Sequence, residues 1–150
     1  MKKLGRMVAL ILTFSLLLAS SAFAATKASS QILKHSIDIT ANKGGEIAIE
    51  VSVTGNGLMK QIGVEKIKIY ENGTTLVESL NKDDSGMSKK NATSYANTIY
   101  FDGETGTRYR VEVSVFAEDA GGDSDSRSKT VTLTCLLYTS PSPRDYAASR

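Results

Sequence analysis

The 150-residue sequence contains no tryptophan, one cysteine, one histidine and only two prolines. With so few histidines and cysteines, the chain cannot build a zinc site from clusters of these residues, and one cysteine leaves no internal disulfide. Stability must therefore come from an apolar core. The 41% apolar and 23% charged residues are typical of a globular protein and not of a disordered or fibrous one.

The single histidine also limits the chemistry that we expect. A hydrolase of the triad type needs a nucleophile, a base and a group that orients the base. His35 is the only histidine, and no Gly-x-Ser-x-Gly motif is present, so we interpret His35 as an exposed or capping residue. We predict no catalytic residue, no enzymatic activity, no metal site and no cofactor.

The acidic residues that could act in pairs all lie in predicted loops. Loops rich in Gly, Ser and Lys stay solvated, whereas glycoside hydrolysis needs one acid with a raised pKa in a dry pocket. Oxygen ligands for Ca²⁺ are also conceivable near residue 123, but the twelve-position calcium loop is absent, so a turn-forming loop is favoured. The carboxylates considered were Asp83, Asp84, Asp102, Glu104, Asp119, Asp123 and Asp125.

The N-terminus has the three parts of a bacterial-type signal peptide. Lys2, Lys3 and Arg6 precede an apolar run of eleven residues, which is shorter than the roughly 20 residues of a membrane span. Ala22-Phe23-Ala24 then supplies the small-x-small pattern that a signal peptidase reads before Ala25. We expect cleavage after Ala24 and export of the mature chain.

The C-terminus changes character abruptly after Thr134. Both prolines and the only cysteine lie in residues 135–150, which show no hydrophobic periodicity. This stretch resembles the translation of a transposon-type sequencing adapter, so we treat it as a non-native tail. Without the signal and the tail, 110 residues remain and the net charge changes from +2 to −2. The charge gives no reason to expect a nucleic-acid partner.

Between these segments, apolar residues recur with period two, which predicts β-strands. Asn72-Gly73 accepts the positive φ angles of a type I′ turn and predicts a hairpin. The predicted organisation is a signal peptide (1–24), a polar lead (25–34), a β-sandwich domain (35–134) and the tail (135–150). The seven predicted strands lie at about 37–41, 47–53, 64–71, 74–79, 95–101, 109–117 and 128–134, and the polar segment 81–91 is predicted to be a loop.

The segment from Gly106 to Ala117, the Gly/Ser/Asp loop after it and the strand from Ser128 to Thr134 together resemble the last two strands of fibronectin type III and immunoglobulin-like domains. The resemblance covers roughly residues 45–134. It implies an all-β, seven-stranded antiparallel sandwich in which Tyr109 bonds back to the preceding corner. The chain departs from that pattern by lacking tryptophan. The mature chain is also similar to small secreted sandwich proteins of Gram-positive bacteria.

If the strands near residues 66–70 and 110–116 are neighbours, as this resemblance implies, their outward residues form one face. We predict that Lys68 faces Glu112 and that Arg110 lies against Tyr70. The candidate ligand-binding residues on this face are Tyr70, Arg110 and Phe116, with the alternative that the face is only a solubilised surface.

The sequence thus predicts a secreted, non-enzymatic module that binds a protein or glycan at or outside the cell surface. Two alternatives stay open: a structural spacer, and an accessory domain of a larger secreted enzyme truncated at Thr134. We expect no nucleic-acid partner and no membrane span in the mature chain. The sequence does not determine the oligomeric state.

Overall fold

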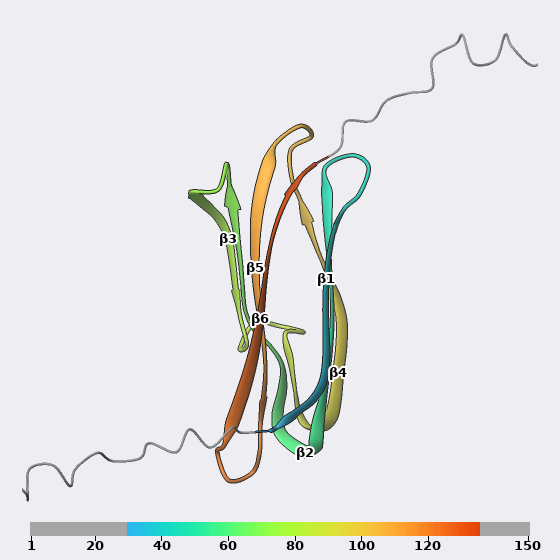
Figure 1. Ribbon diagram of the computed structural model, residues 1–150, viewed down its shortest axis with the longest axis vertical. Coiled ribbons are helices and arrows are strands. Elements are labelled where there is room, and N and C mark those ends of the chain that lie inside the picture. Colours follow the sequence, from blue (N-terminus) through green and yellow to red (C-terminus); the bar gives the residue numbers. More distant parts are fainter. Residues whose placement is uncertain (1–29, 136–150) are drawn as a thin grey trace, which may run out of the picture.

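The computed structural model describes residues 30–135, and this part of the chain is all-β (Figure 1). It contains no helix, and therefore no helix long and apolar enough to cross a membrane. The predicted cleavage-site residues Ala22, Ala24 and Ala25 lie outside the described residues, as does the tail from residue 136 onward. The strands are β1 (Ile32–Ala41), β2 (Glu46–Glu71), β3 (Thr75–Asn81), β4 (Ser88–Asp102), β5 (Arg108–Glu118) and β6 (Ser124–Thr134).

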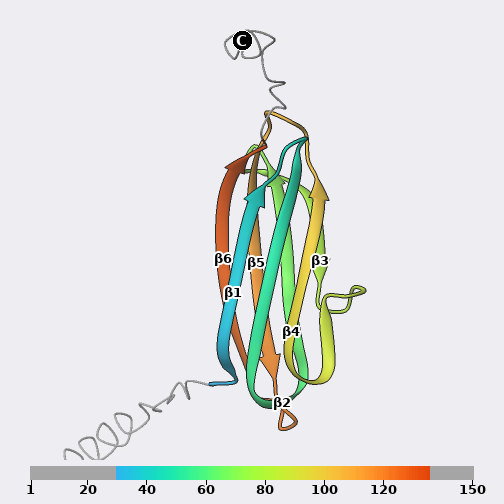
Figure 2. The same cartoon turned by 90° about the vertical axis from the view of Figure 1, so that its right-hand side faces the viewer.

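The strands form one curled antiparallel sheet in which β2 has the central position. The first half of β2 pairs with β1 on one side and β4 on the other. Its second half pairs with β3 and β5, and β5 pairs with β6. Figure 1 shows the result edge-on, with β1 and β4 in one layer and β3, β5 and β6 in the other. Figure 2 shows β1, β2 and β4 side by side.

The structure has six strands where the sequence predicted seven, because the segments 47–53 and 64–71 belong to one strand, β2. The Gly55–Gly57 segment lies between the two predicted strands but does not end β2. The pairing with β4 resumes after the bend, with Met59 opposite Ala92 and Gly63 opposite Ser88. β4 therefore follows β2 around the bend and begins at Ser88, inside the segment predicted to be a loop.

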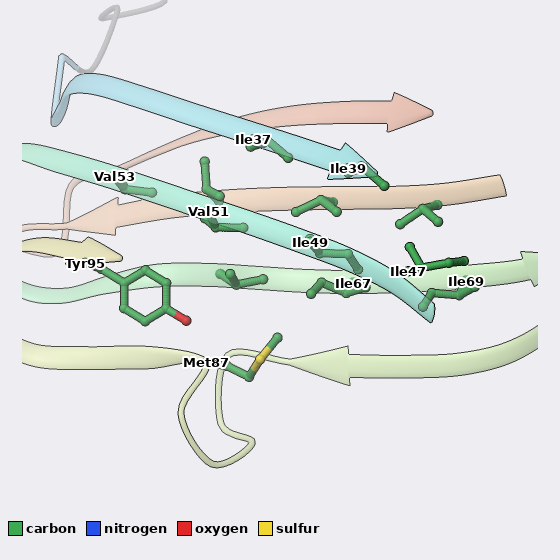
Figure 3. Packing of buried hydrophobic residues seen from close by; sticks show 14 of the residues in the cluster. Ile37, Ile39, Ile47, Ile49, Val51, Val53, Ile67, Ile69, Met87 and Tyr95 are labelled. Carbon is green, nitrogen blue, oxygen red and sulfur yellow. The ribbon is translucent and has the colours of Figure 1, made fainter. Parts of the chain in front are cut away.

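The alternating apolar residues meet between the two layers. Ile47, Ile49, Ile67 and Ile69 of β2 point into this space (Figure 3), and none is more than 1% exposed. No polar or charged residue within residues 30–135 is buried, so the core is held by removal of apolar surface from water. The core residues are Ile32, Ile37, Ile39, Ile47, Ile49, Val51, Val53, Met59, Ile62, Val64, Ile67, Ile69, Met87, Tyr95, Tyr109, Val111, Val113, Val115, Ala117 and Cys135.

Two predicted turn features are confirmed. Asn72 and Gly73 have φ angles of 51° and 80°, as a type I′ turn requires, and they join β2 to β3. The Glu104 N–H donates a hydrogen bond of 3.0 Å to the Tyr109 hydroxyl oxygen, so Tyr109 does tie β5 to the preceding corner. Phe101 meets the Tyr109 ring edge-on at 5.6 Å between centroids.

The ends of the folded part differ slightly from the predicted domain limits of residues 35 and 134. β1 begins at Ile32, within the segment predicted to be a polar lead. Cys135, which we assigned to the tail, is 1% exposed, and its thiol donates to the Gly45 carbonyl oxygen at 3.1 Å. The folded part thus reaches one residue into the adapter-like segment, and the origin of residues 135–150 stays a prediction.

Candidate functional site

The predicted face on β2 and β5 brings two of its three candidate residues together. Tyr70 and Arg110 are directly opposite each other, and the guanidinium carbon of Arg110 lies 4.2 Å from the Tyr70 ring centroid. Lys68 is opposite Glu112, as predicted. Arg110 also forms an ion pair of 2.9 Å with Glu112 on its own strand.

These contacts occupy Arg110 from several sides. One face of the guanidinium covers the Tyr70 ring, one nitrogen binds Glu112, and the buried Nε has no hydrogen-bond partner among the described residues. A ligand would have to displace these contacts to use Arg110. The pair is better explained as a cross-strand contact that stabilises the sheet than as a prepared binding group.

The prediction that Phe116 is exposed on this face is wrong. Its side chain is 5% exposed; it lies opposite Gly63, which has no side chain, and Lys82 approaches its ring to 5.8 Å. Phe116 is six residues from Arg110, or about 20 Å along a strand. Tyr70 and Phe116 therefore do not form one platform.

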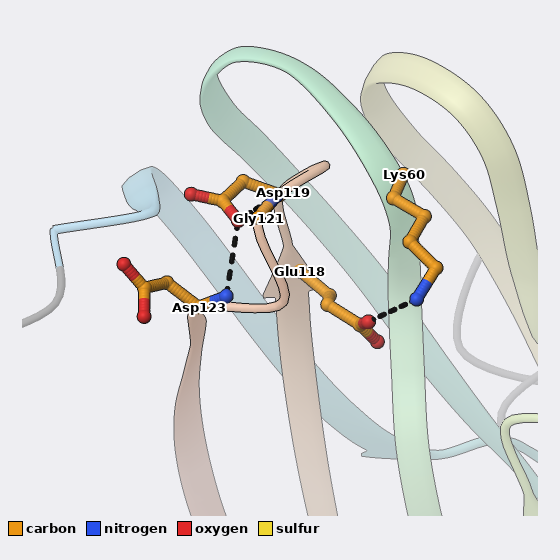
Figure 4. Close-up of polar contacts among 5 residues, drawn as sticks. All are labelled: Lys60, Glu118, Asp119, Gly121 and Asp123. Carbon is orange, nitrogen blue, oxygen red and sulfur yellow. Dashed lines mark hydrogen bonds and ion pairs between the residues drawn. The ribbon is translucent and has the colours of Figure 1, made fainter.

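The loop between β5 and β6 is built around Asp119 (Figure 4). Its Oδ1 accepts hydrogen bonds from the Gly121 N–H (2.8 Å) and the Asp123 N–H (3.0 Å), and its Oδ2 accepts one from Gln31 (2.9 Å). The prediction that this loop is turn-forming is therefore confirmed. In residues 30–135 no three His, Cys, Asp or Glu side chains are grouped to hold a metal ion.

Beside this loop, Lys60 and Glu118 form an ion pair of 2.6 Å. The hydrogen bond from Lys60 holds the pKa of Glu118 below its usual range. The seven carboxylates considered above as catalytic acids or calcium ligands, from Asp83 to Asp125, lie in loops or at strand ends. His35 lies on β1 and is exposed, as expected. The geometry assembles no catalytic group from these residues.

A second site, which sequence reasoning missed, lies on the outer face of β1, β2 and β4. A hollow of about 560 Å³ opens there, with the first half of β2 as its floor. Two cross-strand rows build it: Ser36, Ser52 and Ala96 form one, and Asp38, Glu50 and Thr98 form the next. Small side chains on the central and flanking strands leave the space open. The lining residues are Ser36, Asp38, Glu50, Val51, Ser52, Ala96, Asn97 and Thr98.

The hollow is acidic because Asp38 and Glu50 are direct partners on neighbouring strands. Asp38 accepts a hydrogen bond of 2.8 Å from the Ser36 hydroxyl and lies 3.5 Å from the Lys129 ammonium. The Ser36 hydrogen bond and then Lys129 lower the pKa of Asp38. Asp38 is therefore ionised at neutral pH and presents negative charge at the hollow.

An exposed aromatic ring extends this face. Tyr100 is 62% exposed and lies opposite Ala48, two residues beyond Thr98 on β4. Thr98 and Tyr100 share one face of β4, because side chains alternate along a strand. The sequence contained this pattern of small hydroxyls, carboxylates and one tyrosine, but only the register between strands places these residues together.

No protein-family model matches the chain, and no curated protein matches it. The sporulation control protein Spo0M from Bacillus subtilis is similar in structure, with 12% identity and a TM-score of 0.39 over 72% of this chain and 50% of that chain. The chain thus spans half the length of the Spo0M structure. A solution structure described as a late embryogenesis abundant (LEA) protein has 12% identity and a TM-score of 0.38, and the match covers 90% of this chain and 88% of that chain. Neither likeness assigns a family or a function.

Proposed function

We propose that the protein is a secreted, non-enzymatic module that binds a glycan at or outside the cell surface through the hollow on β1, β2 and β4. The observation that carries the proposal is the lining of this hollow, where hydroxyl and carboxylate groups converge in one depression with Tyr100 beside it. Ligand sites are typically concave and hold a few well-placed polar groups. Hydroxyl-rich ligands suit such a lining.

The same surface suits a protein partner less well. Protein interfaces concentrate binding energy in buried aromatic and arginine residues at the centre of a patch. Here the exposed large apolar residues are scattered over different strands, and the aromatic pair predicted for β2 and β5 is divided by the burial of Phe116. This distribution favours the glycan over the protein within the predicted function.

We also propose that the domain is of the fibronectin type III or immunoglobulin-like kind. Three observations support this. β1, the first half of β2 and β4 lie in one layer, while the second half of β2, β5 and β6 lie in the other, as strands A, B, E and C, F, G do in such sandwiches. Tyr109 makes the corner hydrogen bond. Counting β2 once for each layer gives seven strands.

Export through the signal peptide is part of the same proposal. Its support is the charged start, the short apolar run and the Ala22-Phe23-Ala24 pattern. N-terminal sequencing of the protein recovered from culture medium is expected to begin at Ala25. Retention in the cells with Met1 still present would contradict export while leaving the glycan site untested, so the two parts of the proposal can fail separately.

The binding experiment uses the charge of the hollow. We expect immobilised oligosaccharides that are neutral or carry free amines to retain the protein better than uronic-acid oligosaccharides, because Glu50 beside Asp38 repels anions although Lys129 offsets part of the Asp38 charge. Ser52→Leu fills the floor of the hollow and should weaken retention about tenfold or more. Ser114→Leu, at an outward serine on β5 that contacts Ser128, is the control. Equal retention of the two variants would refute this site.

A further inference from the structure

The edges of the curled sheet differ in how they are protected. Sheets usually guard a free edge with a lysine, a bulge, a short strand or a covering segment. The free edges of β1 and β6 face each other, and the Lys129 ammonium on β6 donates a hydrogen bond to the Ile37 carbonyl oxygen on β1. Each of these two edges is therefore covered by the other. β3 has seven residues and a register shift near Tyr70.

β4 is guarded over its first part only. Lys89 and Lys90 precede Asn91, which has a φ of 51°, and the register with β2 shifts between residues 54 and 59. From Ser94 to Asp102 the pairing with β2 runs without a shift. The seven residues 95–101 (YANTIYF) contain no charge, proline or glycine. Five of them are aromatic or β-branched residues, which have high strand propensity. Within residues 30–135, this is the sheet edge that lacks such protection.

The hydrogen bonds show which backbone groups this edge presents. The Gly103 N–H donates to the Gly45 carbonyl oxygen at 3.0 Å, and hydrogen-bonded pairs alternate along an antiparallel ladder. The odd-numbered residues of β4 from 95 to 101 therefore turn their backbone groups toward β2. The N–H and C=O groups of Ala96, Thr98 and Tyr100 point the other way, to the open side. Ile99 and Phe101 face the core but stay only partly buried.

We infer that this edge pairs with the same edge of a second copy of the chain, antiparallel and with a two-fold axis at Thr98. This register is the one that matches all seven uncharged residues with each other. It places Tyr100 opposite Ala96 of the second copy, a large residue beside a small one, and Thr98 opposite itself, a favourable cross-strand pair. Asp102 falls opposite Ser94, so no like charges meet.

The pairing closes after two copies. The described part of each chain, residues 30–135, has one such edge. A two-fold contact uses the same residues on both sides, so no further copy can add at this point. The two outer faces of β1, β2 and β4 then join into one continuous six-stranded face. This inference does not depend on the proposed glycan site, because it rests on the backbone edge of β4.

Sedimentation velocity of the full chain over a range of concentrations tests the pairing. The mean mass is expected to rise from that of one chain to that of two. Thr98→Lys puts two like charges on the two-fold axis and should raise the dimer dissociation constant about tenfold or more. Thr40→Lys is the control, because Thr40 is an outward threonine at the opposite edge of the same face. A monomer at every concentration, or association unchanged by Thr98→Lys, would overturn the inference.

Cross-linking tests the register itself. In a Cys135→Ala background, Thr98→Cys brings two thiols together at the axis, where paired Cα atoms lie about 5.5 Å apart, within disulfide range. Mild oxidation is expected to link Thr98→Cys into a dimer and to leave Thr40→Cys largely monomeric. Equal cross-linking of the two variants would show that the edge is not paired in this way, even if the chain associates through other surfaces.

Discussion

At the scale of the residue, Tyr109 shows how one side chain joins an element to its neighbour. Its ring is 3% exposed and packs against Gly103, where a Cβ would come within 2.8 Å of the ring. Its hydroxyl oxygen accepts the hydrogen bond from Glu104. The residue therefore needs both an aromatic ring and an oxygen at its tip.

Tyr109→Phe keeps the ring and removes the acceptor. We expect the free energy of unfolding to fall by about 0.5–1.5 kcal/mol, since the partly buried Glu104 N–H loses its partner. Urea denaturation measures this change. Tyr100→Phe is the control: the same atom is removed from an exposed ring, and the change should stay within about 0.5 kcal/mol. Equal effects in the two variants would mean that the corner bond contributes nothing.

Phe116 illustrates where residue-level patterns fail. Phe116 is an even number of residues from Arg110 and Glu112 along β5, so the alternation of side chains alone predicts that it points outward with them and is exposed. The register places it opposite Gly63, a position without a side chain. A bulge at Glu65, between the paired residues Val64 and Lys66, shifts the phase of β2 relative to β5 nearby. Neither cause can be seen in one strand alone.

At the scale of the element, the turn between β1 and β2 depends on two consecutive glycines with different surroundings. Gly44 and Gly45 have φ angles of 86° and 95°, so both occupy backbone conformations that favour glycine. A Cβ on Gly44 would meet nothing within 4 Å, whereas one on Gly45 would lie 2.2 Å from the Gly103 carbonyl oxygen. The backbone contact beside Gly45 joins the start of β2 to the end of β4.

This difference gives a matched pair of variants. Gly44→Ala should cost about 1–2 kcal/mol from the positive φ alone. Gly45→Ala should cost a further 1–3 kcal/mol or so, because the methyl group must push the Gly103 backbone away. Thermal and urea unfolding of both variants measure the difference. If Gly45→Ala proves no more destabilising than Gly44→Ala, the close approach of these two backbones is contradicted.

At the scale of the whole molecule, the two layers are held at one end by residues that are far apart in the sequence. Cys135 follows β6, yet its thiol contacts the Gly45 carbonyl at the start of β2. Its backbone N–H donates to Thr107, and its carbonyl oxygen accepts from Gly106. Burial raises the pKa of the Cys135 thiol, which makes it a poor nucleophile while the chain is folded.

Labelling of Cys135 therefore reports on the stability of the whole fold. We expect thiol reagents to react with the native chain about a thousandfold or more slower than with the chain in urea, since exposure requires opening of the layers. Ser126→Cys in a Cys135→Ala background provides an exposed thiol on β6 for comparison. Native labelling of Cys135 as fast as that of the exposed control would show that the chain end frays independently.

The sequence alone was sufficient to predict the all-β class and the Asn72-Gly73 hairpin. These features depend on local patterns, because a strand with one buried face must alternate and a type I′ turn must accept positive φ. The neighbouring positions of Tyr70 and Arg110 and the corner bond of Tyr109 were predicted because the resemblance supplied the order of two strands and the role of the tyrosine.

Only the tertiary structure decided the remainder. The path of β2 around its bend, the burial of Phe116, the acidic hollow and the open edge of β4 all depend on which residue of one strand lies opposite which residue of another. Register is fixed by contacts between distant segments, by bulges and by the space beside particular glycines. The sequence of one strand does not specify which residues of another strand lie opposite it. The face that two strands form together is therefore known only from the folded chain.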